Sequence, residues 1–190
     1  MVVRPDKSAL RELAAAQDGY FSLDQAQEAG YSSQLIRYHC NAGMFQRIRR
    51  GIYRLSDYPE SERPDLTIVW LWSGRLGVFS HGTALSLHGL SDLLPERIHM
   101  TLPLSERGRS RSLPAGLLLH YAEISSSEMG WHGSVPVTSP SRTLYDCIAS
   151  GLSPSLLRQA LEQAVERGLL DVLGITRIAE SIDALERRGE

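Results

Sequence analysis

The sequence contains little that would mark an exported or membrane-spanning protein. Its 190 residues include two cysteines, Cys40 and Cys147, far apart in the chain. A chain of this length builds a core without cross-links, so we expect two reduced thiols rather than a disulfide. The N-terminal residues MVVRPDKSAL lack the apolar core of a secretion signal, and no segment approaches the roughly 20 apolar residues of a membrane span. We therefore expect a cytoplasmic protein without membrane contact.

The usual catalytic motifs are also absent. Lys7 is the only lysine, and no glycine-rich phosphate loop ends in Lys-Ser or Lys-Thr. The motifs HExxH, CxxC and GxSxG do not occur. No expected strand carries the two alternating carboxylates of a nucleotidyltransferase, and the clustered acids of a metal-dependent nuclease are missing. We therefore predict no catalytic residues, no enzymatic activity and no cofactor.

Histidine offers one weak candidate for a metal or proton-transfer pair. His81 and His88 are seven residues apart on an expected helix capped by Ser80, so they would share a face. A zinc site normally uses three or four ligands, and no third ligand lies nearby in the sequence. We interpret both as hydrogen-bonded structural histidines and predict no metal site.

Charge is present but unevenly distributed. The net charge is only −2, yet residues 31–55 contain five arginines and no acidic residue. Residues 56–96 contain two arginines against six acidic residues. Such a contrast suggests a module that binds a polyanion joined to a module of another kind. The alternative is a basic face that is merely solvated.

The beginning of the chain is predicted to form helices. Apolar residues recur at helical spacing over residues 10–17. Ser22 and Gln25 have the spacing of a capping box, which predicts a second helix over about residues 23–29.

A third helix is predicted after a short glycine-containing turn. It begins at Ser32 or Ser33 and ends near Asn41, with Leu35 and Ile36 facing the core. Two helices joined in this way are typical of a helix-turn-helix, whose second helix enters the major groove of DNA. The residues that this helix would present to DNA are Ser32, Ser33, Gln34, Arg37, Tyr38 and Asn41. Side chains of these types bind phosphates and base edges.

From Phe45 the apolar pattern changes to alternation, which predicts a short hairpin with its turn at Arg50-Gly51. The pattern sends Arg47 and Arg49 to one side. A helix-turn-helix followed by a basic hairpin is a winged helix, so we expect Arg47, Arg49 and Arg50 to lie along a phosphate backbone or minor groove. The alternative is a three-helix bundle with a solvated hairpin. We interpret Tyr38 and Tyr53 as packing residues rather than base contacts.

Residues 57–64 contain two prolines and several acids and are predicted to be a linker. The domains expected are thus a winged helix over 1–56 and a second domain over 65–190. In the second domain, 97–103 alternates like a strand, with 117–122 and 133–138 as possible partners, and helices follow Ser139-Pro140 and Ser153-Pro154. The whole chain is therefore assigned to the α+β class, with a mixed α+β C-terminal domain.

The second domain has two further features, a basic segment and a cysteine. Residues 105–112 hold Arg107, Arg109 and Arg111 against Glu106 and form either a second phosphate contact or a solvated loop. Cys147 lies on an apolar helical stripe and is interpreted as a core thiol.

Three segments resemble the AbiEi-type antitoxins of bacterial type IV toxin–antitoxin systems. The first is LRELAAAQDGYFSLDQAQEAGYSSQLIRYHCNAGMFQRIRRGIYRL, similar to the family's N-terminal winged helix. The others are SHGTALSLHGLSDLLPERIHMTLP and VPVTSPSRTLYDCIASGLSPSLLRQAL, similar to its middle and later parts. Together these segments span roughly residues 8–170.

The resemblance implies a function. Such antitoxins are paired with a nucleotidyltransferase-like toxin encoded beside them, without a stable complex, and they repress their own operon by binding double-stranded DNA at inverted repeats in their promoter. We therefore expect an antitoxin and autorepressor whose antitoxin activity lies in the C-terminal domain. The alternative is a protein-interaction module, or a transcriptional regulator without antitoxin activity. The oligomeric state, the operator sequence and the toxin are left open.

Overall fold

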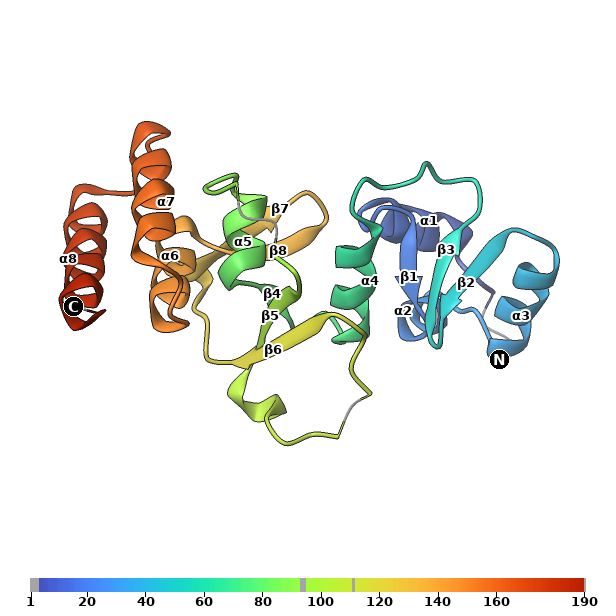
Figure 1. Ribbon diagram of the computed structural model, residues 1–190. Helices are drawn as coiled ribbons and strands as arrows, with labels where there is room; N and C mark the ends of the chain where they lie inside the picture. The colour runs from blue at the N-terminus through green and yellow to red at the C-terminus, as the bar shows by residue number, and fades with distance from the viewer. Residues whose placement is uncertain (1–3, 93–94, 111, 190) are drawn as a thin grey trace. The chain divides into compact units, whose positions relative to one another are not determined.

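The computed structural model describes residues 4–92, 95–110 and 112–189, which form two compact units (Figure 1). The N-terminal unit runs to Arg75 and the C-terminal unit starts at Leu76. This division falls after the linker that we expected at 57–64. The reason is helix α4 (Pro64–Trp72), which packs on strands of the N-terminal unit instead of opening the second domain. Its sequence is apolar on nearly every side, so it is buried there.

The N-terminal unit has the element order of a winged helix, as predicted. Its three strands form an antiparallel sheet in the order β1-β3-β2. The elements are α1 (Lys7–Ala15), β1 (Tyr20–Ser22), α2 (Leu23–Glu28), α3 (Ser33–Asn41), β2 (Phe45–Arg49) and β3 (Ile52–Leu55). Strand β1 was not expected, because three residues are too few to show an alternating pattern.

Side-chain caps fix where α2 and α3 begin. The Gln25 backbone N–H donates to Ser22 Oγ at 3.2 Å, and the Ser22 N–H donates to Gln25 Oε1 at 2.9 Å. The predicted capping box is therefore confirmed. At α3 the capping residue is Ser32, whose Oγ accepts from the Leu35 N–H at 3.2 Å. These bonds satisfy backbone donors that a helix start otherwise leaves unpaired.

Aromatic rings and aliphatic side chains make the core of this unit. Phe21 lies 5.0 Å from Phe45 and 5.8 Å from Tyr53 between ring centroids. Ile36 holds α3 onto this core with 2% of its surface exposed. The packing interpretation is thus confirmed for Tyr53 and wrong for Tyr38, which is 63% exposed. Tyr38 lies on the outer face of α3, opposite the side that meets the core.

A β-bulge changes the expected arrangement of the hairpin arginines. Arg47 pairs with Tyr53 and Arg49 with Ile52, so Ile48 is an extra residue in β2. Tyr53 and Ile52 are neighbours in β3 and point to opposite faces. Because paired residues share a face, Arg47 and Arg49 also lie on opposite faces. The prediction that both point one way is therefore wrong.

The C-terminal unit is a mixed sheet covered by helices, as expected for the α+β class. Its five strands have the order β6-β5-β4-β8-β7, in which β4–β8 and β5–β6 are parallel and the other pairs antiparallel. The elements are β4 (Val78–Phe79), α5 (His81–Leu87), β5 (Ile98–Leu102), the short 3-10 helix η1 (Leu104–Glu106), β6 (Leu117–Tyr121), the 3-10 helix η2 (Ser126–Glu128), β7 (Met129–His132), β8 (Val135–Thr138), α6 (Pro140–Ala149), α7 (Pro154–Glu166) and α8 (Val172–Gly189).

The expected strands formed, but one of their pairings was wrong. β5 and β6 pair as the sequence suggested. β8 pairs with β4 and β7 and not with β5. The two-residue strand β4 lies between β5 and β8, and it is too short to be recognised from a periodic pattern.

Helices α6 and α7 begin at their prolines, as predicted. Ser139 caps α6, whereas Ser153 makes no capping bond to α7. Helices α7 and α8 pack on α6, which lies against α5 (Figure 1). Their shared core includes Cys147, which is 1% exposed, so its interpretation as a core thiol is confirmed. No helix in the described part of the chain combines the length and apolarity needed to span a membrane.

Candidate functional site

The outer face of α3 carries a continuous stripe of polar residues. Gln34, Arg37, Tyr38 and Asn41 fall at positions i, i+3, i+4 and i+7, which places them along one side of a helix. All four are exposed, as are Ser32 and Ser33 at the helix start. The hydroxyl of Ser32 is engaged as the helix cap. All six predicted residues of this helix are therefore exposed.

The basic hairpin lies next to this helix. Strand β2 contacts α3, and Figure 1 shows the two side by side. Arg47 lies near Cys40 of α3: burial raises the pKa of the Cys40 thiol, and the positive charge of Arg47 partly offsets that shift. Arg50 is exposed at the turn, and Gly51 beside it has the positive φ of 77° that a tight turn requires. Arg49 is half-buried on the opposite face of the hairpin.

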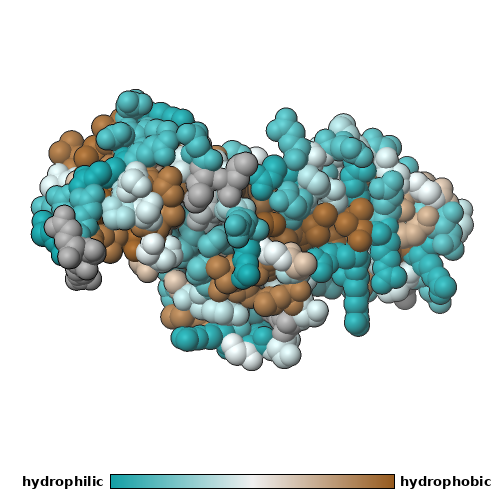
Figure 2. Space-filling model, viewed as in Figure 1, coloured by the Kyte–Doolittle hydropathy of each residue, from teal (hydrophilic) through white to brown (hydrophobic). Residues whose placement is uncertain are grey.

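Most of these side chains are free to meet a partner. In the described part of the chain, no hydrogen bond or ion pair engages the side chains of Gln34, Arg37, Asn41, Arg47, Arg49 or Arg50. Other arginines are paired: Arg11 Nη1 lies 2.7 Å from Asp57 Oδ2, and Arg63 Nη2 lies 3.3 Å from Asp65 Oδ2. In Figure 2 the surface over α3, at the right of the view, is mostly hydrophilic or neutral.

One arginine of the basic segment does not belong to this surface. Arg54 is 7% exposed, and its Nη2 donates to the Tyr58 backbone oxygen at 2.5 Å. Its guanidinium also lies 5.8 Å from the centre of the Tyr20 ring. Arg54 is therefore a structural residue, and four arginines remain for a polyanion.

The basic loop predicted at 105–112 is partly neutralised by its own acid. Glu106 is buried and its Oε1 lies 2.9 Å from Arg109 Nη1. Arg107 is exposed, and Arg111 lies outside the described residues. A second phosphate contact here stays a prediction.

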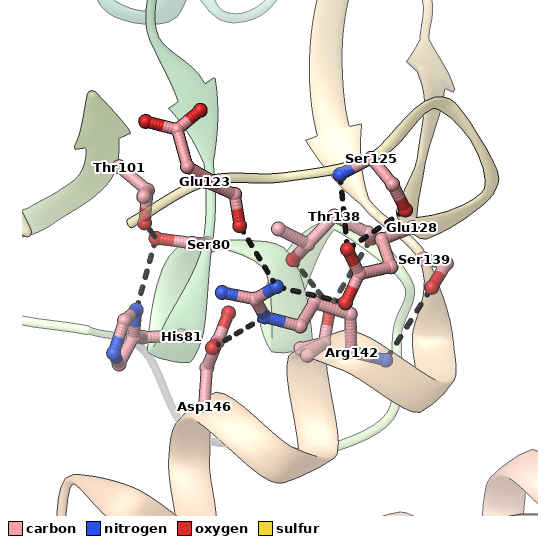
Figure 3. A network of polar contacts seen from close by, with 11 residues as sticks. Ser80, His81, Thr101, Glu123, Ser125, Glu128, Thr138, Ser139, Arg142 and Asp146 are labelled. Carbon is pink, nitrogen blue, oxygen red and sulfur yellow. Dashed lines mark hydrogen bonds and ion pairs between the residues drawn. The ribbon is translucent and has the colours of Figure 1, made fainter. Parts of the chain in front are cut away.

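A second polar site lies in the C-terminal unit around Arg142, at the start of α6 (Figure 3). Its Nε donates to Asp146 Oδ1, one helical turn further along α6, at 2.8 Å. Its Nη1 also donates to Glu128 Oε1 at 2.8 Å. The side chains of Arg142 and Asp146 are only 17% and 12% exposed, so this pair is largely buried rather than on the helix surface.

His81 and His88 are both hydrogen-bonded, as expected, and their side chains have different partners. His88 Nε2 bonds the Thr138 backbone oxygen at 2.7 Å, and His81 Nδ1 lies 2.9 Å from Ser80 Oγ. His81 also meets His99 of β5 and His120 of β6, and the ligand atoms of the three lie within 4.8 Å of one another. The sequence suggested neither His99 nor His120. The available signal was the alternation of β5, which places His99 and Thr101 on the face opposite Met100.

Ser80 connects the cluster to the sheet. It was expected to cap α5, but its hydroxyl makes no capping bond. Ser80 Oγ instead accepts from Thr101 Oγ1 at 2.7 Å and lies 2.9 Å from His81 Nδ1. His81 itself has φ of 50°, a conformation that costs free energy in a residue with a side chain.

Burial determines the protonation of the histidines, and hydrogen bonds determine that of Glu128. Burial, with the neighbouring His120, His99 and Arg142, lowers the pKa of His81 to about 3. Burial also lowers the pKa values of His99 and His120. The Ser125 backbone N–H and hydroxyl and the Arg142 side chain lower the pKa of Glu128 to about 2. At neutral pH the imidazoles are therefore uncharged and Glu128 is ionised.

Part of the N-terminal unit is similar to a known protein family. Residues 8–56 match the family model described as "Transcriptional regulator, AbiEi antitoxin", which confirms the resemblance over this segment. No curated protein sequence matches the chain. The crystal structure of the RV2827C protein from Mycobacterium tuberculosis is similar with a TM-score of 0.51 at 14% identity, covering 96% of this chain and 77% of that one. At that identity the similarity shows the fold alone.

Proposed function

We propose that the chain is a type IV antitoxin that binds operator DNA through its winged helix and represses its own operon. The premise is that residues 8–56 match a family of transcriptional regulators. Such a regulator acts in the cytoplasm on double-stranded DNA, and catalysis is not part of its action.

One observation carries the DNA-binding part of this proposal. The exposed stripe on α3 and the neighbouring hairpin arginines form a surface without acidic residues, and their side chains make no hydrogen bond or ion pair within the described chain. In a winged helix the second helix of the helix-turn-helix reads the major groove, which is the role of α3 here. Phosphate contacts supply much of the affinity, which suits Arg37, Arg47, Arg49 and Arg50. Gln34 and Asn41 are then placed to contact bases.

The arrangement of the hairpin adds a detail to this interface. Because the bulge sends Arg47 and Arg49 to opposite faces, the two cannot follow one phosphate backbone together. Arg47, next to α3, contacts the phosphates that flank the major groove. Arg49 and Arg50 reach the adjacent backbone or minor groove.

The antitoxin part rests on the family resemblance. Its partner is a nucleotidyltransferase-like toxin encoded beside it, which it opposes without a stable complex. The test is growth rescue: expression of this chain should restore growth of cells that express the neighbouring gene. The two proteins should not co-purify.

DNA binding is tested by fluorescence anisotropy with the duplex upstream of the protein's own gene and a random duplex of the same length. We expect submicromolar binding to the upstream duplex that outcompetes the random duplex. Between 50 and 200 mM salt the affinity should fall by at least about tenfold, because phosphate contacts release counterions. Binding no stronger than to random DNA would contradict autorepression. It would favour the alternative of a protein-interaction module.

A further inference from the structure

Three histidines from distant parts of the sequence converge in the C-terminal unit. His81 starts α5, His99 lies in β5 and His120 lies in β6. The parallel register pairs Thr101 with His120, and His99 lies two residues from Thr101 on the same face of β5. The His81 ring lies 3.6 Å from the His120 ring between centroids. The cluster is therefore a product of the sheet register and not of local spacing.

The spacing of the nitrogens suits a zinc ion. Zn–N bonds are about 2.0–2.1 Å long and zinc sites are tetrahedral, so two nitrogens on one ion are about 3.3 Å apart. His99 Nδ1 and His120 Nε2 are 3.1 Å apart and share a hydrogen bond, which an ion bound to both nitrogens would replace. His81 Nδ1 is held by Ser80 Oγ, which leaves Nε2 as its ligand atom, and a protein group on the other ring nitrogen is typical of metal-binding histidines. The three rings are stacked nearly parallel, at interplanar angles of 13° to 28°. Binding therefore requires the rings to turn until their nitrogens, which lie within 4.8 Å of one another, point at one ion.

A carboxylate oxygen beside the cluster has no partner. Asp146 Oδ2 is buried and accepts no hydrogen bond from the described residues, although Oδ1 is paired with Arg142. Figure 3 shows this carboxylate between the His81 ring and the Arg142 guanidinium. An unpaired buried carboxylate oxygen is costly unless a cation or a donor meets it.

A cavity gives access to the cluster. It has a volume of about 340 Å³ and is lined by residues that include His81, His120 and Asp146. The exposed Arg107 belongs to the same lining, so the cavity opens to solvent. An ion therefore has a path of entry, and a water or an anionic group has space beside it.

We propose that His81, His99 and His120 bind a divalent transition-metal ion, Zn²⁺, with Asp146 Oδ2 accepting a hydrogen bond from a water on the ion. Neutral imidazole nitrogens are the ligands that zinc prefers, and three of them leave a fourth position open toward the cavity. The strained backbone of His81 is then the cost of aiming its ring at the ion.

The direct test is titration of the untagged full-length chain with Zn²⁺ after removal of metals by EDTA and dialysis. Isothermal calorimetry at pH 7 should show one zinc per chain with submicromolar affinity. Co²⁺ should give the intense visible absorption of a tetrahedral site, a measurement that needs no variant. Absence of stoichiometric zinc binding, or of the cobalt bands, would overturn the proposal.

Variants locate the ion. H99Q and H120Q should each weaken zinc binding by at least about 100-fold, because a ligand matters more than the outer groups, whose loss costs about 10–100-fold. The control is H132Q, which changes an exposed histidine in β7 and should bind zinc as the wild type does. Circular dichroism in EDTA checks that each variant folds. Undiminished binding by folded H99Q and H120Q would place zinc elsewhere and refute the assignment.

Discussion

The two units carry their polar residues in opposite ways. In the N-terminal unit, Arg37, Arg47 and Arg50 are exposed, have no hydrogen-bond or ion-pair partner among the described residues, and come from one short stretch of sequence. In the C-terminal unit, Arg142 and His81 are largely enclosed and meet partners from distant strands and helices. A surface of the first kind suits a large, solvated polyanion. A site of the second kind suits a small ligand or ion that fits into a cavity.

Charge reversal on the hairpin is expected to give the largest effect. The double variant R49E/R50E should lose operator affinity by at least about 100-fold, because two phosphate contacts are lost and repulsion from the DNA backbone replaces them. Anisotropy measures the affinity. The matched control is R63E/R75E, which makes the same change of net charge at exposed arginines of the same unit. If both variants lose equal affinity, net charge rather than this surface controls binding.

The second largest effect is expected from removal of the Arg142 guanidinium, which should lower the unfolding free energy. R142M leaves the largely buried Asp146 carboxylate without its partner. We expect the unfolding free energy to fall by about 2–3 kcal/mol. This is less than the loss of a fully buried ion pair would cost, because water still reaches part of this pair. Urea unfolding followed by circular dichroism measures it.

The matched control for this experiment is R158M. Arg158 also meets two carboxylates, Asp183 and Glu186, but its side chain is 42% exposed. Its loss should be clearly the smaller, since exposed ion pairs contribute little. Equal losses at both positions would show that enclosure of the Arg142 site has no energetic consequence.

Acid pH should lower the stability of the C-terminal unit. His88 is suited to test this, because it is not one of the proposed zinc ligands. Burial is the main cause that lowers the pKa of His88, with His132 also lowering it and the Thr138 oxygen opposing the shift. Arg167 Nη1, 3.0 Å from the His88 backbone oxygen, adds a nearby positive charge. Below its ordinary pKa the histidine takes up a proton more readily in the unfolded chain. The unfolding free energy therefore falls as the pH falls from 7 to 5.

The measurement is urea unfolding in EDTA at pH 7 and pH 5, for the wild type and H88Q. Between pH 7 and pH 5 the unfolding free energy should fall less in H88Q than in the wild type, because the variant has one titrating group fewer. The difference is at most about 1.4 kcal/mol per pH unit. An identical pH dependence in both proteins would show that His88 titrates alike when folded and unfolded.

The smallest expected effect concerns the start of α3. S32A removes the hydroxyl that accepts from the Leu35 N–H and should cost about 1 kcal/mol of unfolding free energy. S33A is the control, because Ser33 is exposed at the first helical position and makes no capping bond. Chemical unfolding compares the two. A loss in S33A as large as in S32A would contradict the assignment of the cap.

The contrast between the units also explains what could be predicted from sequence. In the N-terminal unit the capping pair, the glycine-containing turn and the arginines are local signals, so the winged helix and its exposed residues were predictable. The bulge at Ile48 was not, because it depends on how β2 pairs with β3. The burial of Arg54 could not be predicted either, because its hydrogen-bond partner Tyr58 lies beyond the hairpin.

In the C-terminal unit the chemistry depends on sheet register. His99 and His120 are 21 residues apart and become neighbours only through the parallel pairing of β5 and β6. The two-residue strand β4, which positions His81, has no periodic signal. The local pair Arg142 and Asp146 was predictable, whereas the contact of Arg142 with Glu128 across the fold was not. Non-local sites of this kind require the structure.

The central claim is that α3 and the β2–β3 hairpin form one DNA-binding surface. The most direct measurement is NMR mapping of backbone amide shifts in ¹⁵N-labelled full-length protein as the upstream duplex is added. The account predicts that the largest shifts fall in 32–41 and 46–51, with small changes around the histidine cluster. Large shifts confined to 105–110, or to the helices of the C-terminal unit, would contradict it.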